Sequence, residues 1–134
     1  MIYFPDHPAA WAMLFAAGAV IGSFLNVVIY RWPEGESIIR PPSHCTSCGA
    51  RLGLVDLVPV LSYLWLRGRC RHCGHRFSPR YALVEALTGL LLVGAVANWA
   101  LSWHALVAFV VCACLVVVAF IDLDHMVIPD ELVM

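Results

Sequence analysis

Four cysteines in two CxxCG motifs are the residues of this sequence best suited to bind a metal. The motifs lie in HCTSCGARLG and RCRHCGHRFS, and 21 residues separate Cys48 from Cys70. Two such knuckles match a zinc ribbon, in which four thiolates close a tetrahedral, structural site and each glycine permits a tight turn. The predicted ligands are Cys45, Cys48, Cys70 and Cys73, for zinc or another thiophilic metal. Two disulfides are the alternative, and the nearby histidines His44, His72 and His75 are alternative ligands.

The segment FIDLDHMVIPD carries three aspartates at the end of a long apolar run. Asp122 is the candidate catalytic residue, because a carboxyl beside a second carboxylate can activate water as in aspartic proteases. It is expected to be partly buried and to end the third helix. Asp124, about 200° away on an ideal helix, is expected to face lipid headgroups or to play a supporting role. Pro129 predicts a helix end near Ile128, with Asp130 as cap of a following helix.

Two polar residues inside apolar segments are further candidates for supporting roles. Glu85 lies at the start of the second span in RYALVEALTG, where a carboxylate is costly and tends to be paired or functional. Arg80, Tyr81 and Asn26 are its possible partners, and a plain ion pair with Arg80 is an open alternative. Asn26 follows the Gly18–Gly22 GxxxG pattern, which favours close helix packing with the asparagine hydrogen-bonded to a neighbouring helix.

The elements that must position these residues are transmembrane helices. Hydrophobic residues make up 62% of the 134 positions and charged residues only 13%, which is too apolar for an ordinary soluble domain. Two long charge-free runs, 8–30 and 86–121, predict three spans at about 9–30, 82–98 and 104–121. A turn at NWALSWH separates the last two spans, with Trp99 and Trp103 suited to the membrane interface. The first span is interpreted as retained rather than as a signal peptide.

The distribution of charge predicts the topology. All eight basic residues are arginines between Arg31 and Arg80. Loops rich in basic residues stay in the cytoplasm, so segment 31–80 and Asp122 are expected on the cytoplasmic side of a bacterial inner membrane, with a periplasmic N-terminus. The predicted parts are 1–30, the first span; 31–80, the cysteine-rich domain; and 81–134, the second and third spans with the start of a peptidase domain.

The cysteine-rich segment has features of its own. The stretch between the knuckles, GLVDLVPVLSYLWLRGR, is apolar enough to lie on the membrane surface, with Tyr63 and Trp65 as anchors. Asp56 is expected to cap a short helix that begins near residue 57 or 58, and β structure is expected only as short hairpins at the knuckles. Cys112 and Cys114, two positions apart on a helix, point to nearly opposite sides and are interpreted as apolar packing residues. The fold class is therefore all-α, a polytopic transmembrane helical protein with a small cytoplasmic zinc-ribbon-like insertion.

Five segments in order resemble the bacterial prepilin leader peptidase/N-methyltransferases, the type IV prepilin peptidases of aspartic peptidase family A24. They are GSFLNVVIYRWP (22–33), the paired CxxC knuckles, PVLSYLWLRGRC (59–70), SPRYALVEALTG (78–89) and IDLDHMVIPD (121–130). The resemblance implies an intramembrane aspartic protease that cuts the leader of prepilins or pseudopilins of type IV pili and type II secretion. It also implies methylation of the new N-terminus with S-adenosylmethionine, the cysteine domain acting as scaffold. Asp122 matches the first catalytic aspartate of that family.

The second aspartate of the family lies in a GxGD motif, which this sequence lacks. We therefore expect a fragment, the N-terminal part of a longer enzyme, that alone lacks peptidase activity. The expected partners are prepilin or pseudopilin substrates, membrane lipid and the remaining transmembrane helices of the enzyme, and no nucleic acid. Two other classes stay open: a noncatalytic membrane protein whose zinc knuckle docks a partner, and a metal transporter or sensor. Neither explains Asp122 and the IPD segment.

Overall fold

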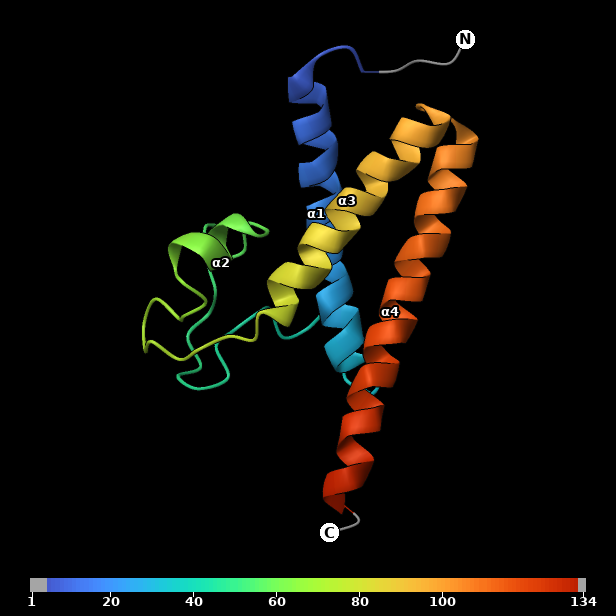
Figure 1. The fold of residues 1–134 in the computed structure, drawn as a ribbon. Coiled ribbons are helices and arrows are strands. Elements are labelled where there is room, and N and C mark those ends of the chain that lie inside the picture. Colours follow the sequence, from blue (N-terminus) through green and yellow to red (C-terminus); the bar gives the residue numbers. More distant parts are fainter. Residues whose placement is uncertain (1–4, 133–134) are drawn as a thin grey trace.

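The computed structural model describes residues 5–132, and from residue 125 onward only the helical backbone. Its described part consists of helices and irregular segments. The helices are α1 (Pro8–Arg31), α2 (Leu61–Trp65), α3 (Arg80–Trp99) and α4 (Trp103–Leu132). In Figure 1 the three long helices form a bundle, α3 crosses α1, and the segment with α2 extends to one side. The all-helical class predicted from the sequence is confirmed.

Helices α1 and α3 meet at glycines. A Cβ atom added to Gly18 would lie 2.8 Å from the Cα of Gly89, and one added to Gly22 would lie 2.8 Å from the Cα of Glu85. No side chain fits in that space, so the two backbones are in direct contact, as a GxxxG pattern allows. Thr88 is fully buried there, and its hydroxyl donates to the carbonyl of Val84 at 2.7 Å. The packing role predicted for Gly18 and Gly22 is confirmed.

Helices α3 and α4 form a hairpin. The turn Ala100–Ser102 joins them, and Ser102 Oγ accepts from the backbone N–H of Ala105 at 3.4 Å. Near the turn, Val96 and Phe109 belong to one apolar cluster of the hairpin. At the other end of the bundle, α4 packs onto α1 and α3 in a second cluster, whose buried members are Ile29, Val84 and Val116. The predicted turn between the second and third spans is confirmed.

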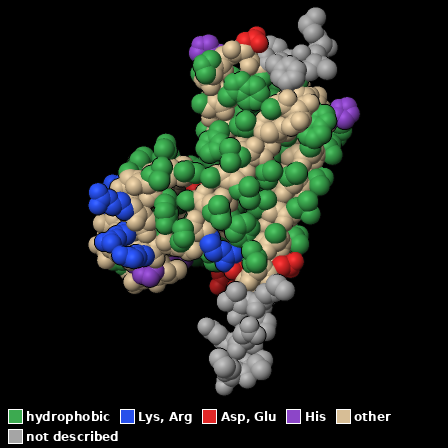
Figure 2. All heavy atoms as spheres, viewed as in Figure 1, with side chains coloured by type: hydrophobic (Ala, Val, Ile, Leu, Met, Phe, Trp, Pro, Cys, Tyr) green, Lys and Arg blue, Asp and Glu red, His purple; other side chains and the backbone are tan. Residues whose placement is uncertain are grey.

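The three long helices are suited to cross a membrane. Each is long enough, and the mean hydropathies of their most apolar windows are 2.2, 1.6 and 3.0 in chain order. Only 17% of the α4 window is buried against the rest of the chain, so most of this helix presents apolar side chains outward. Figure 2 shows the apolar side chains covering the bundle, and the basic ones gathered mainly over the lobe that holds α2. The predicted spans agree with the helices to within two residues, except at the end of α4.

Helix α4 is longer than the sequence predicts. It continues through Asp122 and Pro129 to Leu132, so the expected helix ends at Asp122 and near Ile128 are both wrong. A proline removes one N–H donor and bends a helix, but the other hydrogen bonds of the helix can carry it onward. The cap predicted at Asp130 concerns a side chain outside the described residues.

The segment between α1 and α3 folds around its two knuckles. Antiparallel bridges pair His44 with Arg51 and Arg69 with Arg76, which confirms short hairpins at both knuckles. The helix expected near residue 57 starts instead at Leu61, after Val60 in a left-handed conformation (φ 62°). Asp56 does not cap it: its carboxylate accepts from the N–H of Gly53 at 3.2 Å and pairs with Arg71. That carboxylate thus joins the region between the knuckles to the second knuckle.

Candidate functional site

The two knuckles bring the four predicted cysteines into one cluster. The Sγ atoms of Cys45, Cys48, Cys70 and Cys73 all lie within 4.8 Å of one another. The Sγ atoms of Cys45 and Cys73 are 3.7 Å apart, and those of Cys48 and Cys70 are 3.9 Å apart. A tetrahedral site with Zn–S bonds of about 2.3 Å has S···S edges of about 3.8 Å. All four thiols are free rather than disulfide-bonded. The cluster can therefore hold a metal ion, and its sulfur spacing suits zinc.

Both knuckles have the same backbone geometry. The N–H of Gly49 donates to the carbonyl of Cys45 at 2.9 Å, and Gly74 repeats this with Cys70 at 3.0 Å. Both glycines have positive φ, 70° and 73°, which only glycine adopts without strain. The turns aim backbone N–H groups at sulfur: those of Cys48 and Ser47 lower the pKa of the Cys45 thiol to about 7. The N–H groups of Cys73 and His72 likewise lower the pKa of Cys70. One cysteine of each knuckle is thus prepared to bind metal as thiolate.

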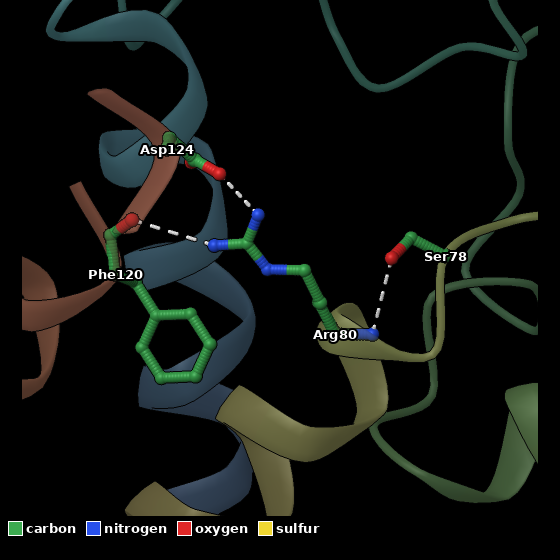
Figure 3. Close-up of polar contacts among 4 residues, drawn as sticks. All are labelled: Ser78, Arg80, Phe120 and Asp124. Carbon is green, nitrogen blue, oxygen red and sulfur yellow. Dashed lines mark hydrogen bonds and ion pairs between the residues drawn. The ribbon is translucent and has the colours of Figure 1, made fainter. Parts of the chain in front are cut away.

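Asp124 faces the start of α3 rather than lipid headgroups. The guanidinium of Arg80 donates to its carboxylate and, at 3.4 Å, to the backbone carbonyl of Phe120. The same guanidinium lies 5.2 Å from the centre of the Phe120 ring. In Figure 3 the Arg80 side chain reaches from α3 to α4, while its backbone N–H donates to Ser78. The sequence indicated Arg80 only as a possible partner of Glu85, and no local pattern predicted that its side chain would contact α4.

Asp122 lies on another side of α4 and is exposed. The partial burial expected for this carboxyl is therefore wrong within the described residues. Phe120 lies two residues before Asp122 and Asp124 two residues after it, and Arg80 donates hydrogen bonds to both of them. Because residues two apart differ by about 200° around a helix, holding these positions turns Asp122 away from α3. Asp122 and Asp124 thus do not form a pair.

Glu85 and Asn26 make separate contacts at the junction of the bundle and the cysteine-rich segment. Glu85 Oε2 accepts from the backbone N–H of Val60 at 2.8 Å, so the possible ion pair with Arg80 is wrong. This hydrogen bond connects α3 to Val60, the residue of positive φ that immediately precedes α2. Asn26 is buried, and its Nδ2 donates to the carbonyl of Tyr81 at 3.0 Å. The predicted hydrogen bond from Asn26 to a neighbouring helix is confirmed.

A cavity of about 720 Å³ lies between the bundle and the cysteine-rich segment. Asn26, Tyr30, Tyr81 and Glu85 line it from α1 and α3, and Arg40, Asp56 and Arg69 are among the residues that line it from the segment 31–79. This size suits a small molecule. Because its residues are scattered from position 23 to position 85, no single motif predicted the cavity.

The fold and the cysteine cluster define a class of protein: a multi-pass membrane protein whose segment between its first two spans carries four cysteines that can hold a metal ion. The family model of the bacterial peptidase A24 N-terminal domain matches residues 16–99, which include most of α1, the cysteine cluster and all of α3. The chain belongs to this family.

Curated relatives agree with the family. A prepilin leader peptidase/N-methyltransferase of Myxococcus xanthus is 47% identical over 91% of this chain and 36% of its own length. A type 4 prepilin-like proteins leader peptide-processing enzyme of Escherichia coli is 40% identical over 95% of this chain and 54% of its own length. A prepilin leader peptidase/N-methyltransferase of Aeromonas hydrophila is 39% identical over 94% of this chain and 53% of its own length. The chain thus spans about half or less of these relatives, and no solved structure matches it.

Proposed function

We propose that this chain is the N-terminal part of a membrane-embedded enzyme that removes the leader peptide of type IV prepilins or type II pseudopilins and methylates the new N-terminus. The observation that carries the proposal is the match of residues 16–99 to the peptidase A24 N-terminal domain, supported by relatives named for both activities. The proposed parts are residues 1–30 and 81–134, which supply the spans, and residues 31–80, the cysteine-rich domain.

Asp122 is the proposed catalytic carboxylate. It needs a second carboxylate within reach, because an aspartic protease activates water with a pair that shares one proton. Within the described part of the long helices, Asp124 is paired with Arg80 and Glu85 accepts from the N–H of Val60, so both carboxylates are already engaged. The relatives are about two to three times as long as the part that matches. We therefore assign the second carboxylate to transmembrane helices that this sequence does not include.

The active end of the bundle is proposed to face the cytoplasm. Through Arg80, Asp124 contacts the residue where the cysteine-rich segment ends and α3 begins, so Asp122 and the cysteine cluster belong to the same end. The eight arginines at that end favour the cytoplasmic side of the inner membrane. A prepilin leader would then be cut where it enters the membrane from inside.

The proposed cofactors have separate roles. Zinc in the cluster of Cys45, Cys48, Cys70 and Cys73 would be structural, because four sulfur ligands leave no coordination position for water. It would stabilise a segment that has little apolar core of its own. S-adenosylmethionine would supply the methyl group for the new N-terminal amine. Membrane lipid and the remaining helices of the enzyme are the proposed partners of the outward faces of α4.

Cleavage assays with a purified prepilin test this proposal. In the longer enzyme that contains this segment, Asp122→Asn should abolish cleavage, whereas Asp6→Asn, an exposed acidic residue before α1, should leave it unchanged. The 134-residue chain alone should leave prepilin uncut. Cleavage by this chain that disappears in Asp122→Asn would refute the need for a second carboxylate from outside it, and full activity of Asp122→Asn in the longer enzyme would refute the role of Asp122.

A further inference from the structure

The bundle side of the 720 Å³ cavity has the chemistry of a cation site. Tyr30 of α1 and Tyr81 of α3 stack with ring centres 5.0 Å apart, and both line the cavity. Glu85, one helical turn after Tyr81, lines it as well and uses Oε2 to accept from Val60. A carboxylate accepts about four hydrogen bonds, so Glu85 keeps acceptor capacity for a ligand. Aromatic faces beside a carboxylate stabilise a cation, and most strongly where water is partly excluded.

The facing side of the cavity carries charges of both signs, with more arginines than carboxylates. Arg40, Arg69 and Arg71 line it from the cysteine-rich segment together with Glu36 and Asp56, and Asp56 is paired with Arg71. The guanidinium of an arginine binds a carboxylate through two parallel N–H donors. A molecule that spans the cavity would therefore present a cation to the helices and an anionic or oxygen-rich group to the arginines.

We propose that this cavity binds S-adenosylmethionine, with its sulfonium against Glu85 and the tyrosine pair and its carboxylate toward Arg40 and Arg69. This assignment rests on the proposed methyl-transfer function, because the relatives' names supply the methyl-transfer chemistry and the cavity supplies the location. The molecule carries a permanent cation, a carboxylate and an aromatic base, which match the three kinds of group in the cavity. A volume of about 720 Å³ lies within the range of roughly 300–1,000 Å³ that is usual for small-molecule sites.

The cavity is separate from the proposed peptidase carboxylate. Its lining residues come from positions 23–85, that is from α1, α3 and the segment between them, and α4 contributes none of those described. Glu85 is also the acceptor of the Val60 N–H at the start of α2. The cavity therefore depends on the docking of the cysteine-rich segment onto α3, which connects the metal cluster to binding of the methyl donor.

Isothermal titration of the purified 134-residue chain in lipid nanodiscs, loaded with zinc, tests the assignment. The probes are S-adenosylmethionine and S-adenosylhomocysteine, which differ in that the second has a neutral thioether in place of the sulfonium. Glu85→Gln keeps an acceptor for Val60 but removes the charge. It should weaken binding of S-adenosylmethionine roughly tenfold, as expected for loss of a charged contact, and change that of S-adenosylhomocysteine less than about twofold.

Two further variants make the test specific. Tyr30→Leu removes an aromatic face but keeps an apolar side chain. It should also weaken the binding of S-adenosylmethionine more than the binding of S-adenosylhomocysteine. Glu34→Gln removes an exposed acidic residue that does not line the cavity and should change neither affinity. Helix content and bound zinc, measured for each variant, identify any that misfolds. If Glu85→Gln misfolds, Tyr30→Leu decides.

The assignment is overturned if the wild-type chain binds no S-adenosylmethionine, or if the cavity variants weaken both probes equally. These outcomes are distinct from failure of the proposed function. If the longer enzyme cleaves and methylates prepilin while the cavity variants bind the methyl donor normally, the cavity is the wrong location and the function stands. If the chain binds the methyl donor through Glu85 but the longer enzyme does not cleave prepilin, the peptidase proposal falls and the cavity stands.

Discussion

Arg80 and Asp124 form an ion pair that connects the first residue of α3 to α4 (Figure 3). The same guanidinium donates to the carbonyl of Phe120, so one side chain holds α4 on both sides of Asp122 along the chain. The two side chains are 33% and 29% exposed, so water screens the pair and its contribution to stability is small, about 1 kcal/mol or less. Its importance is geometric, because together with the packing of α4 on α1 and α3 it sets how α4 is rotated and thus where Asp122 points.

Breaking this pair should reduce peptidase activity more than stability. In the longer enzyme, Asp124→Asn removes the ion pair but leaves the contacts of Arg80 with Phe120. We expect kcat for prepilin cleavage to fall roughly tenfold with KM changed less than about twofold, because a misplaced catalytic group lowers the rate of the chemical step. Steady-state cleavage kinetics measure this, and thermal unfolding should shift by only a few degrees.

Charge exchange separates positioning from a structural role. The double variant Arg80→Asp with Asp124→Arg restores the pair in reverse and should recover part of the lost kcat. Arg76→Gln, a change of an arginine outside the bundle, is the matched control and should have no effect on kcat. Equal losses in the single and double variants would contradict the role of the pair.

The glycine contacts between α1 and α3 predict different effects of two glycine substitutions on the free energy of unfolding. Gly22→Val places side-chain atoms where only 2.8 Å separates an added Cβ from the Cα of Glu85. The helices must move apart, and we expect a loss of about 1–3 kcal/mol in the free energy of unfolding. Gly94→Ala on α3 is the control, because an added Cβ there meets no atom within 4 Å. Unfolding of both variants in detergent checks this, and equal stability would contradict the packing.

Metal content tests the cysteine cluster. The wild-type chain should contain one zinc ion per molecule, measured by mass spectrometry of the metals, and Cys45→Ser should lose it because three ligands cannot close the site. Cys112→Ser on α4 is the matched control and should keep the zinc. A chelator should unfold the cysteine-rich segment while the three long helices persist by circular dichroism. Zinc retained in Cys45→Ser would exclude that residue as a required ligand.

Reporter fusions test the proposed topology. Alkaline phosphatase, active only outside the cytoplasm, should be active when fused after Ser102 in the turn between α3 and α4. It should be inactive when fused after Gly53 in the cysteine-rich segment or after Asp124 on α4. Activity after Asp124 would place the proposed catalytic end outside and would refute the peptidase proposal.

Much of the fold follows from patterns that local sequence carries. Long charge-free runs predict the three spans because apolar helices are the stable form of such segments in a membrane. The spacing of Cys45, Cys48, Cys70 and Cys73 predicted the cluster because each CxxCG motif builds its own turn with a glycine at positive φ. Gly18 and Gly22 predicted close packing because the pattern places both on one face of α1.

Contacts between distant segments could not be predicted in this way. Glu85 had three possible partners in the sequence, and the one it takes, the N–H of Val60, is a backbone group that carries no side-chain signal. Asp56 was expected to cap a helix, but its two carboxylate oxygens contact Arg71 and the N–H of Gly53 instead. The end of α4 was also mispredicted. Pro129 is a local signal for a helix end, but the hydrogen bonds of the remaining helix residues continue the helix to Leu132.

The sequence by itself determined that this protein has three membrane-spanning helices and four clustered cysteines, because hydrophobic length and ligand spacing act over short distances along the chain. Only the tertiary structure decided that Arg80 binds Asp124, that Asp122 therefore faces away from α3, and that a cavity lies between the tyrosine pair and the arginines. These features depend on how α1, α3 and α4 cross and on where the cysteine-rich segment docks. The many weak contacts of packed side chains set that geometry, and no single motif encodes it.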